Sequence, residues 1–240
     1  MSGVRRGPSW RGEGGQHQGA RPYQEDSWAL RTLADGALMA IVADGMGGHA
    51  GGAVASKVAV NAFLAALDRG GSMADGLNEA NDAVRSRAAN DASLTGMGST
   101  LAAARIKGDE IAWISVGDSP LYLVFADRVE RLNADHSMAP QIDALVRRGV
   151  LTPEEGRRHH GRHTLREAVM GEPLKLIDEG RRRIVPGATL LLCSDGIESL
   201  PRERIAALAA FSVSGLIDAV LSMKKPHQDN VTVIKLDQKP

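Results

Sequence analysis

Short hydrophobic runs of strand length, separated by turn residues, are the main pattern of this chain. Two such runs cover residues 27–33 and 38–43 and are joined by Ala34-Asp35-Gly36, a sequence typical of a hairpin turn. We therefore expect these two strands to pair antiparallel. Four more short runs predict an antiparallel meander, with strands at residues 100–106, 111–116, 121–125 and 129–132.

Helical spacing of apolar residues predicts two consecutive helices after the first two strands. The first covers residues 54–67, and the second covers residues 72–90, with Ser72 as N-cap and Asp75 three positions later. The segment 137–170 reads as polar and helical. The remaining elements are expected as strands 181–185 and 189–194, helices 201–209 and 214–223, and strand 231–236.

The order of these elements predicts an α+β fold. Many strands with two pairs of helices, and no regular strand–helix alternation, indicate an antiparallel sheet core. No internal repeat or second domain boundary is seen, so residues 16–240 are expected to form a single domain. Residues 1–15 read as a flexible arm, because the first 19 residues contain six glycines and almost no apolar pattern.

Composition narrows the possible classes of protein. The 29 basic and 29 acidic residues balance, so neither nucleic acid nor a membrane is an expected partner. Cys193 is the only cysteine, which excludes an intrachain disulfide and a Cys-based zinc site and favours a cytoplasmic location. No run approaches the roughly 18 apolar residues that a membrane span requires. Arg5-Arg6 is not followed by an apolar stretch, so no export signal is expected.

Three aspartates occupy the ends of apolar segments. Asp44 and Asp195 each follow an apolar run and precede a glycine, and Asp229 comes just before the strand 231–236. A carboxylate at the tip of a buried strand is costly, and a hard divalent cation such as Mg²⁺ or Mn²⁺ removes that cost. One Asp-Gly pair alone is more typical of a turn, but their agreement indicates a metal centre. Further carboxylates stand in Gln24-Glu25-Asp26 and Gly117-Asp118-Ser119.

The glycine-rich segment 44–52 also suggests a nucleotide site. Gly45-x-Gly47-x-x-Ala50 follows a strand and precedes a helix, as in the dinucleotide-binding fingerprint. That fold needs a second parallel strand ending in an acidic residue about 20 positions later, whereas a second helix is expected here. A carboxylate at position 44 would also repel a pyrophosphate unless a metal stood between them. We therefore disfavour the nucleotide hypothesis.

Seven short motifs, in this order, resemble those of the metal-dependent, 2C-type Ser/Thr protein phosphatases, especially the compact bacterial members. The motifs are Arg21-Pro-Tyr-Gln-Glu-Asp26, Val42-Ala-Asp-Gly-Met-Gly-Gly48, Gly96-Met-Gly-Ser-Thr100, Gly117-Asp-Ser119, Asp135-His-Ser137, Ser194-Asp-Gly196 and Asp229-Asn-Val-Thr232. The resemblance covers residues 16–236. It implies a four-layer α/β/β/α sandwich of two antiparallel sheets flanked by helix pairs, with a two-metal site at one edge.

The same resemblance implies a role for each candidate site residue. Arg21 would bind the substrate phosphate, because a guanidinium offers a planar fork of donors. With Arg21, the catalytic residues would be Asp44 and Asp195. The two ions, Mn²⁺ or Mg²⁺, would be held by Asp44, which bridges them, the Gly45 carbonyl, Asp195 and Asp229; Glu25 and Asp26 would act through metal-bound waters, and Asp118 with Asp195 would hold a third, weaker ion.

The implied reaction is hydrolysis of phosphoserine and phosphothreonine in proteins. Hydroxide from a water that bridges the metals would attack in line, with no covalent intermediate. The implied partners are phosphorylated proteins and a cognate Ser/Thr kinase, and the implied state is a monomer. Two alternatives stay open: a phosphomonoesterase for small molecules, and a non-catalytic module that binds phosphorylated segments. The intact set of acidic residues together with Arg21 argues against the second.

Some positions depart from the family pattern or lie outside it. Met46 stands where many eukaryotic members have a histidine proposed as general acid, so that role has no assigned residue. Pro120 replaces an arginine that many relatives have, which leaves the surroundings of Asp118 open. Cys193 lacks the arginine loop of cysteine phosphatases and is expected to pack in the core. One segment also carries a basic patch with two possible roles, a solvated face or a surface that attracts phosphorylated substrates. The residues of this patch are Arg157, Arg158, His159, His160 and His163.

Overall fold

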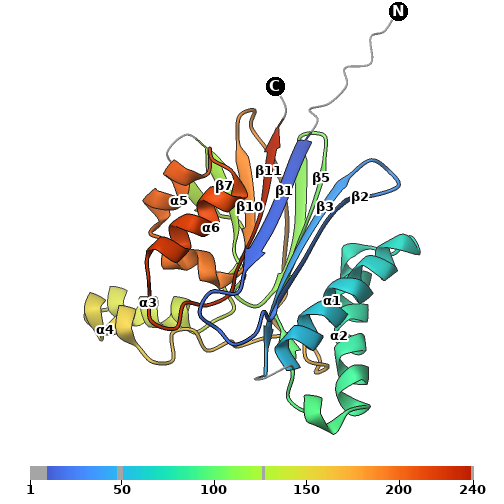
Figure 1. Cartoon of the computed structure of the whole chain (residues 1–240), viewed down its shortest axis with the longest axis horizontal. Helices are drawn as coiled ribbons and strands as arrows, with labels where there is room; N and C mark the ends of the chain where they lie inside the picture. Colours follow the sequence, from blue (N-terminus) through green and yellow to red (C-terminus); the bar gives the residue numbers. More distant parts are fainter. Residues whose placement is uncertain (1–9, 48–50, 126–127, 239–240) are drawn as a thin grey trace, which may run out of the picture.

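Two antiparallel sheets face each other in the computed structural model, which describes residues 10–47, 51–125 and 128–238 (Figure 1). All strand pairs are antiparallel. In spatial order the first sheet contains β1 (Trp10–His17), β11 (Val231–Gln238), β10 (Thr189–Cys193), β7 (Leu121–Phe125) and β8 (Arg128–Arg131). The second contains β2 (Asp26–Thr32), β3 (Leu38–Met46), β5 (Leu101–Lys107), β6 (Glu110–Val116) and β9 (Asp178–Arg183), and β4 (Gly98–Ser99) pairs with the end of β3.

A pair of helices covers the outer face of each sheet (Figure 1). The second sheet packs against α1 (Gly51–Asp68) and α2 (Met73–Ala89), and the first packs against α5 (Arg202–Leu208) and α6 (Val213–Ser222). Two short helices, α3 (Ala139–Arg147) and α4 (Pro153–Arg158), lie apart from these layers, and the 3₁₀ turns are η1 (Ala92–Leu94) and η2 (Asp195–Ser199). The predicted α/β/β/α sandwich is therefore confirmed.

Alternating side chains of the central strands fill three apolar layers. On β3, Met39 and Ile41 face the helices α1 and α2, whereas Ala40 and Val42 face the other sheet. On β10, Leu190 and Leu192 face the second sheet, and Cys193 packs with α5 and α6. Burial raises the pKa of the Cys193 thiol, which suits its predicted role in packing. Because these strands are buried on both faces, they read as continuous apolar runs in the sequence.

The predicted four-stranded meander is wrong. Strands β5 and β6 pair in the second sheet, but β7 and β8 pair in the first, so the loop 117–120 crosses between the sheets. Alternation identifies a strand, but it does not say which sheet the strand joins. This crossing places Asp118 at the end of the sandwich where the two sheets supply residues to one cavity.

The segment 137–170 is only partly helical, which corrects a second prediction. It contains α3 and α4, and residues 159–170 contain no helix. A single bridge at Ser99↔Val169 holds the end of the segment against β4, and a second bridge at Ser137↔Leu165 joins the start of the segment to its end. The polar composition that suggested a helix over the whole segment reflects its exposure, because most of its side chains lie away from the three apolar layers.

The predicted flexible arm is wrong for residues 10–15, which belong to β1 and pair with β11. Residues 1–9 lie outside the described residues. The glycines that suggested disorder are required by close packing: a Cβ at Gly14 would collide with the ring of Trp28, and one at Gly12 would collide with Leu30. Backbone pairing with β11 along the whole strand, together with close packing against Trp28 and Leu30, therefore holds β1 in the sheet.

Substituting Gly14 with Ala should lower the free energy of unfolding by about 1–3 kcal/mol, because the added methyl group overpacks against Trp28. Urea unfolding measures the change. The matched control is Gly215→Ala in α6, where the nearest atom would lie at 3.6 Å, an ordinary contact. That variant should be neutral or stabilising, since Ala favours a helix over Gly. Equal stability of Gly14→Ala and wild type would contradict the packing account of β1.

Candidate active site

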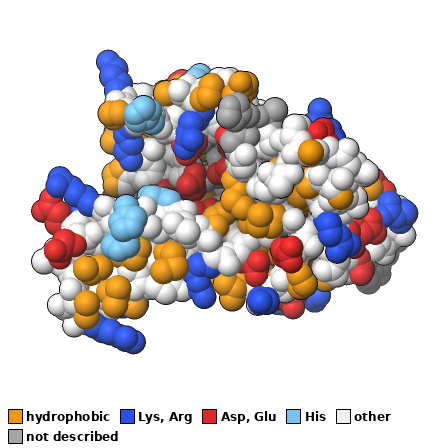
Figure 2. All heavy atoms as spheres, turned by 90° about the horizontal axis from the view of Figure 1, so that it is seen from below, with side chains coloured by type: hydrophobic (Ala, Val, Ile, Leu, Met, Phe, Trp, Pro, Cys, Tyr) orange, Lys and Arg blue, Asp and Glu red, His pale blue; other side chains and the backbone are white. Residues whose placement is uncertain are grey.

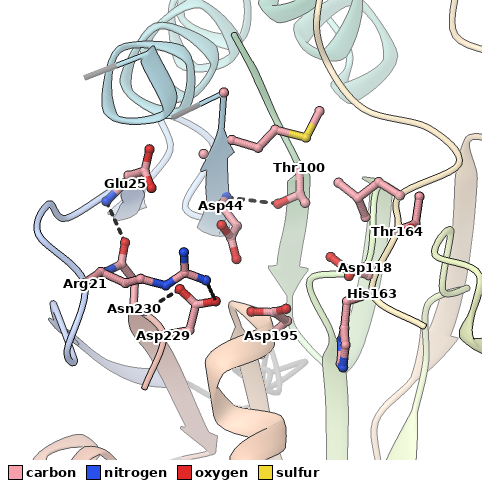
Figure 3. Close-up of a pocket in the computed structure, with 14 residues that line it drawn as sticks. Arg21, Glu25, Asp44, Thr100, Asp118, His163, Thr164, Asp195, Asp229 and Asn230 are labelled. Carbon is pink, nitrogen blue, oxygen red and sulfur yellow. Dashed lines mark hydrogen bonds and ion pairs between the residues drawn. The ribbon is translucent and has the colours of Figure 1, made fainter. Parts of the chain in front are cut away.

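A cavity of about 540 Å³ lies at one end of the sandwich. Figure 2 shows acidic side chains in the depth of a hollow on this face, with histidine side chains beside it. In Figure 3 the carboxylates of Asp44, Asp118 and Asp195 point into the same space. The cavity thus brings together seven of the eight predicted site residues: Arg21, Glu25, Asp44, Gly45, Asp118, Asp195 and Asp229.

Asp44 lies near the end of β3, and hydrogen bonds with Ser99 and Thr100 hold its backbone. The Asp44 N–H donates to Thr100 Oγ1 at 2.9 Å, and its carbonyl accepts from Thr100 N–H at 2.8 Å and from Ser99 Oγ at 3.0 Å. With the backbone held on both sides, the carboxylate is directed into the cavity (Figure 3). Ser99 and Thr100 belong to a motif that resembled the family, but their contact with Asp44 was not predicted.

The glycine after each strand-end aspartate is required by a close backbone approach. A Cβ at Gly45 would collide with the carbonyl of Gly52, and a Cβ at Gly196 would collide with the carbonyl of Asn230. Both glycines have ordinary negative φ or extended backbone, so space and not left-handed conformation explains them. The Asp-Gly pairs therefore mark points where two segments of the site are packed backbone to backbone.

Asn230 joins the N-terminal segment of the site to β11. Its side-chain amide donates to the carbonyls of Gln18 at 2.7 Å and Tyr23 at 3.0 Å, and its side-chain oxygen accepts from Glu25 N–H at 2.7 Å. It thereby places Arg21 and Glu25 beside Asp229. Sequence reasoning included Asn230 in a motif and gave it no role, because its partners are about 205 positions away along the chain.

Asp26 is the predicted site residue that does not line the cavity. It is buried behind Asp44, its register partner across β2 and β3, and it accepts hydrogen bonds from Ser194 Oγ at 2.7 Å and Thr232 Oγ1 at 2.6 Å. Burial raises the pKa of Asp26 to about 6, although the two hydroxyl groups oppose that shift. Asp26 thus links both sheets beneath the site and reaches the cavity only through its neighbours.

Uncompensated acidic groups dominate the electrostatics of the cavity. Burial raises the pKa of Asp44 and Asp195 well above the ordinary range, and neighbouring carboxylates raise both further. Burial also raises the pKa of Asp118 to about 7. Among the described residues, the buried oxygens Glu25 Oε1 and Asp26 Oδ1 have no hydrogen-bond partner. These oxygens are hard ligands in need of positive charge, and they fit divalent cations such as Mg²⁺ or Mn²⁺.

Among the described residues, Arg21 supplies the Lys or Arg side chain that lines this cavity. Its guanidinium pairs with Asp229 at 2.5 Å, and both side chains are partly exposed (Figure 3). Although Asp44, Asp118 and Asp195 line one cavity, no three Asp, Glu, His or Cys side chains in the part of the chain that the structure describes are placed to hold one metal ion together. Because Asp229 pairs with Arg21, we expect this ion pair to break when the Asp229 carboxylate binds a divalent cation. Arg21 would then be available to an anionic substrate.

The Asp118 loop is held by residues to which the sequence assigned no role. Arg131 donates to the Asp118 carbonyl at 2.6 Å and pairs with Asp135 at 3.3 Å and Glu198 at 3.5 Å. The His136 N–H donates to the Gly117 carbonyl at 3.1 Å. Arg131 is only 11% exposed, so it occupies the interior beside the loop. The surroundings of Asp118, left open by Pro120, thus contain a guanidinium from β8.

Removing the Arg131 guanidinium should destabilise the protein. Arg131→Met should lower the free energy of unfolding by about 1–3 kcal/mol, because it leaves the Asp118 carbonyl without this donor and removes the positive charge beside Asp135 and Glu198. Arg128→Met, on the exposed face of the same strand, is the matched control and should change stability by less than about 0.5 kcal/mol. Urea unfolding compares them, and equal stabilities would refute this role.

The residues of the predicted basic patch have different surroundings in the structure. His163 lines the cavity together with Thr164 and Leu165, next to Asp118 (Figure 3). Arg158 instead pairs with Glu154 on α4 at 3.1 Å. The rings of His159 and His160 stack with centroids 4.8 Å apart. The idea that the patch attracts substrates is thus supported by position for His163, and it stays a prediction for the other residues.

Comparison with known proteins agrees with this geometry. A model of the protein phosphatase 2C family matches residues 13–230. The chain is 33% identical over 217 residues to the serine/threonine protein phosphatase PstP of Mycobacterium tuberculosis, covering 84% of this chain and 40% of that protein. It is 29% identical over 233 residues to the serine/threonine phosphatase stp of Listeria innocua, with 91% of each chain covered.

Solved structures show the same fold. The crystal structure of M. tuberculosis PstP/Ppp superposes with a TM-score of 0.81 at 28% identity, covering 96% of this chain and 99% of that one. The PstP catalytic domain in complex with two manganese ions has a TM-score of 0.76 at 28% identity and covers 95% of this chain and 97% of that one.

The two antiparallel sheets with flanking helices and the acidic cavity at one end define a phosphatase-like sandwich. This chain belongs to the protein phosphatase 2C family, as the match over residues 13–230 shows. It spans 40% of the length of the PstP sequences that it matches. None of the helices in the described residues has the length and apolar character that a membrane crossing requires.

Proposed function

We propose that this protein is a divalent-cation-dependent phosphatase that removes phosphate from phosphoserine and phosphothreonine in proteins. The observation that carries the proposal is the cavity in which Asp44, Asp118 and Asp195 converge beside Arg21. The buried carboxylates need positive charge, and the guanidinium can bind phosphate. Family membership and the phosphatase names of the relatives support the same activity.

Two divalent cations, Mn²⁺ or Mg²⁺, fit the donor atoms of this cavity. We propose that Asp44 would contact both ions, that the Gly45 carbonyl would bind one of them, and that Asp195 and Asp229 would bind the other. Glu25 and the more deeply buried Asp26 would act through ordered water, and Asp118 would contribute to a third, weaker site. When bound, the cations supply Lewis-acid activation of water and neutralise the phosphate, so hydrolysis needs no covalent intermediate.

The protein's own residues would bind and orient the substrate. Arg21 would exchange its ion pair with Asp229 for the phosphate oxygens, to which its planar fork can donate two parallel hydrogen bonds. Thr100, Ser99 and Asn230 keep the acidic residues in place through the backbone contacts described above. Asp26 ties both sheets together beneath Asp44. The residue that protonates the leaving oxygen is not assigned, because Met46 carries no proton donor.

We further propose that the chain from β1 (Trp10–His17) onward, and not only from residue 16, acts as one catalytic domain, monomeric and cytoplasmic, whose partners are phosphorylated proteins and a cognate Ser/Thr kinase. The single cysteine, the neutral charge balance and the bacterial relatives support this setting. A phosphomonoesterase for small molecules is the second candidate function. The exposure of Arg21 and the opening of the cavity favour a protein substrate, because a large ligand can approach without a change of fold.

Hydrolysis assays test the proposed function directly. The purified chain should release phosphate from a phosphothreonine peptide and from p-nitrophenyl phosphate in the presence of Mn²⁺. Efficient hydrolysis of small phosphomonoesters together with negligible hydrolysis of the peptide would favour the second candidate. Absence of hydrolysis for every substrate would refute both, and peptide binding without turnover would support a non-catalytic module.

Replacing Arg21 with Ala should mainly weaken substrate binding. We expect KM for a phosphothreonine peptide to rise by about 10- to 100-fold, because hydrogen bonds to a charged group contribute about 1.5–3 kcal/mol. Arg21→Lys keeps the charge and loses the planar fork, so it should recover part of the loss. Steady-state kinetics at saturating Mn²⁺ separates KM from kcat. A normal KM for Arg21→Ala would overturn the assigned role.

A further inference from the structure

A second cavity of about 330 Å³ adjoins the candidate active site. Four residues line both cavities, so the two form one continuous cleft: Arg21, His163, Asp195 and Asp229. One wall of the second cavity is formed by the loop between α6 and β11, which contributes Lys225, Pro226 and His227. A substrate whose phosphate contacts Arg21 therefore has a second binding surface directly beside it.

This loop is held in a defined, uncommon conformation. Lys224 with φ of 47° and His227 with φ of 57° are the non-glycine residues with positive φ in the described part of the chain. The side-chain amide of buried Gln228 donates to Ser199 Oγ at 3.1 Å, and the backbone carbonyl of Gln228 accepts from Ala20 N–H at 2.8 Å. Such conformations persist where surrounding contacts hold them, and they cluster at binding sites. The loop thus presents Lys225 and His227 from a fixed backbone.

The charges of the second cavity leave Lys225 available to a ligand. Asp195 and Asp229 belong to the proposed cation site. Glu198 accepts from Tyr122 Oη at 2.7 Å and lies 3.5 Å from the Arg131 guanidinium, so its charge is compensated within the protein. Lys225 is exposed and has neither an ion pair nor a side-chain hydrogen bond to any residue that the structure describes. At this end of the cleft, the ammonium group of Lys225 therefore carries a positive charge that forms no ion pair with a described residue.

We infer that this second cavity is a subsite for an acidic residue of the substrate, close in sequence to the phosphorylated serine or threonine. Lys225 would pair with the carboxylate, and His227 would line the same wall. The inference rests on the proposed function, since the phosphate at Arg21 sets the position of the peptide. A carboxylate in this subsite would add a partly exposed ion pair to the contacts that the phosphate makes.

Matched phosphothreonine peptides test the subsite. One set carries Glu at the positions flanking phosphothreonine on either side, and the other carries Gln there. With Mn²⁺ at low salt, wild-type kcat/KM should be about two- to fivefold higher for a Glu peptide, the range of an exposed ion pair. The preference should shrink at about 0.5 M salt, where exposed charges are screened.

Variants at Lys225 assign the preference to this loop. Lys225→Gln should abolish the Glu/Gln preference, and Lys225→Glu should reverse it. The matched control is Lys57→Glu, an equal change of charge on the exposed face of α1 outside both cavities, which should keep the wild-type ratio. Equal rates of wild type on Glu and Gln peptides, or an unchanged ratio in Lys225→Glu, would refute the subsite while leaving the phosphatase activity standing. No hydrolysis of any phosphothreonine peptide by wild type would overturn the proposed function and this inference with it.

Discussion

Replacing Asp44 with Asn should lower kcat by about 10³-fold or more and, in the same protein, stabilise the cation-free state. The loss of activity follows because Asp44 is the carboxylate proposed to contact both cations, whose contribution to the reaction amounts to several kcal/mol. The gain in stability follows because Asp44 is half-buried and lies among other carboxylates, and an amide of the same shape carries no charge for them to repel. We expect at least about 1 kcal/mol.

The pH dependence gives this prediction a second measurement. A carboxyl group whose folded-state pKa is raised favours the folded protein in its protonated form, so its stabilising effect is complete below the ordinary pKa of about 4. That stability is lost as the pH rises through the raised values, about 6 for Asp26 and about 7 for Asp118. The Tm of cation-free wild type should therefore fall between pH 5 and 8, and Asp44→Asn should fall less.

An exposed aspartate provides the control for Asp44. Asp218→Asn on α6 should leave kcat unchanged and should alter stability by less than about 0.5 kcal/mol. Thermal unfolding in chelator and steady-state hydrolysis of p-nitrophenyl phosphate measure both quantities on the same samples. A variant Asp44→Asn that keeps more than a tenth of wild-type kcat, or that unfolds at a lower temperature than wild type in chelator, would contradict the assignment.

Removing divalent cations should abolish activity and lower the Tm of wild type. The proposed cations would neutralise carboxylates that line one cavity, so we expect them to bind the folded state and stabilise it. At a Mn²⁺ concentration 100 times its dissociation constant, the expected stabilisation is about 2.7 kcal/mol. Adding Mn²⁺ or Mg²⁺ back after chelation should restore both hydrolysis and Tm, and the more effective ion can be read from the same titration.

The variant Asp44→Asn makes the cation experiment specific to the cavity. Its Tm should respond to Mn²⁺ much less than that of wild type, whereas Asp218→Asn should respond as wild type does. Hydrolysis that is insensitive to chelator would refute the cation-dependent mechanism. A rise in Tm of equal size in wild type and Asp44→Asn would place the ion elsewhere on the protein.

Several features of the fold can be predicted from local patterns. The hairpin of β2 and β3, the capping box at Ser72 and the strand β10 each depend on residues that are close in sequence. The aspartates at strand ends are visible for the same reason, since the change from apolar residues to Asp-Gly is a local signal. These signals predict an α+β fold with an antiparallel sheet core and an acidic site, whereas the four-layer α/β/β/α sandwich is implied by the resemblance of the ordered motifs to the phosphatase family.

Other features depend on contacts between distant segments. The glycines of β1 read as an arm, because the side chain that excludes a Cβ at Gly14 belongs to Trp28 on the other sheet. Strands β5 to β8 read as a meander, because nothing in their alternation shows that the loop around Asp118 changes sheet. The polar segment 159–170 reads as a helix, although it contains none and a single bridge between Val169 and Ser99 holds its end against β4.

The candidate active site likewise combines features that are local in sequence with features that depend on contacts between distant segments. The acidic residues stand in local motifs, so the need for hard cations follows from residue chemistry, whereas the phosphate-binding role of Arg21 is implied by the resemblance to the family. The contacts of Thr100, Asn230 and Arg131 with the site, and the cleft that continues to Lys225, exist only once both sheets are assembled. Hydrogen bonds and cavities join residues through space, and a linear pattern carries no measure of that distance.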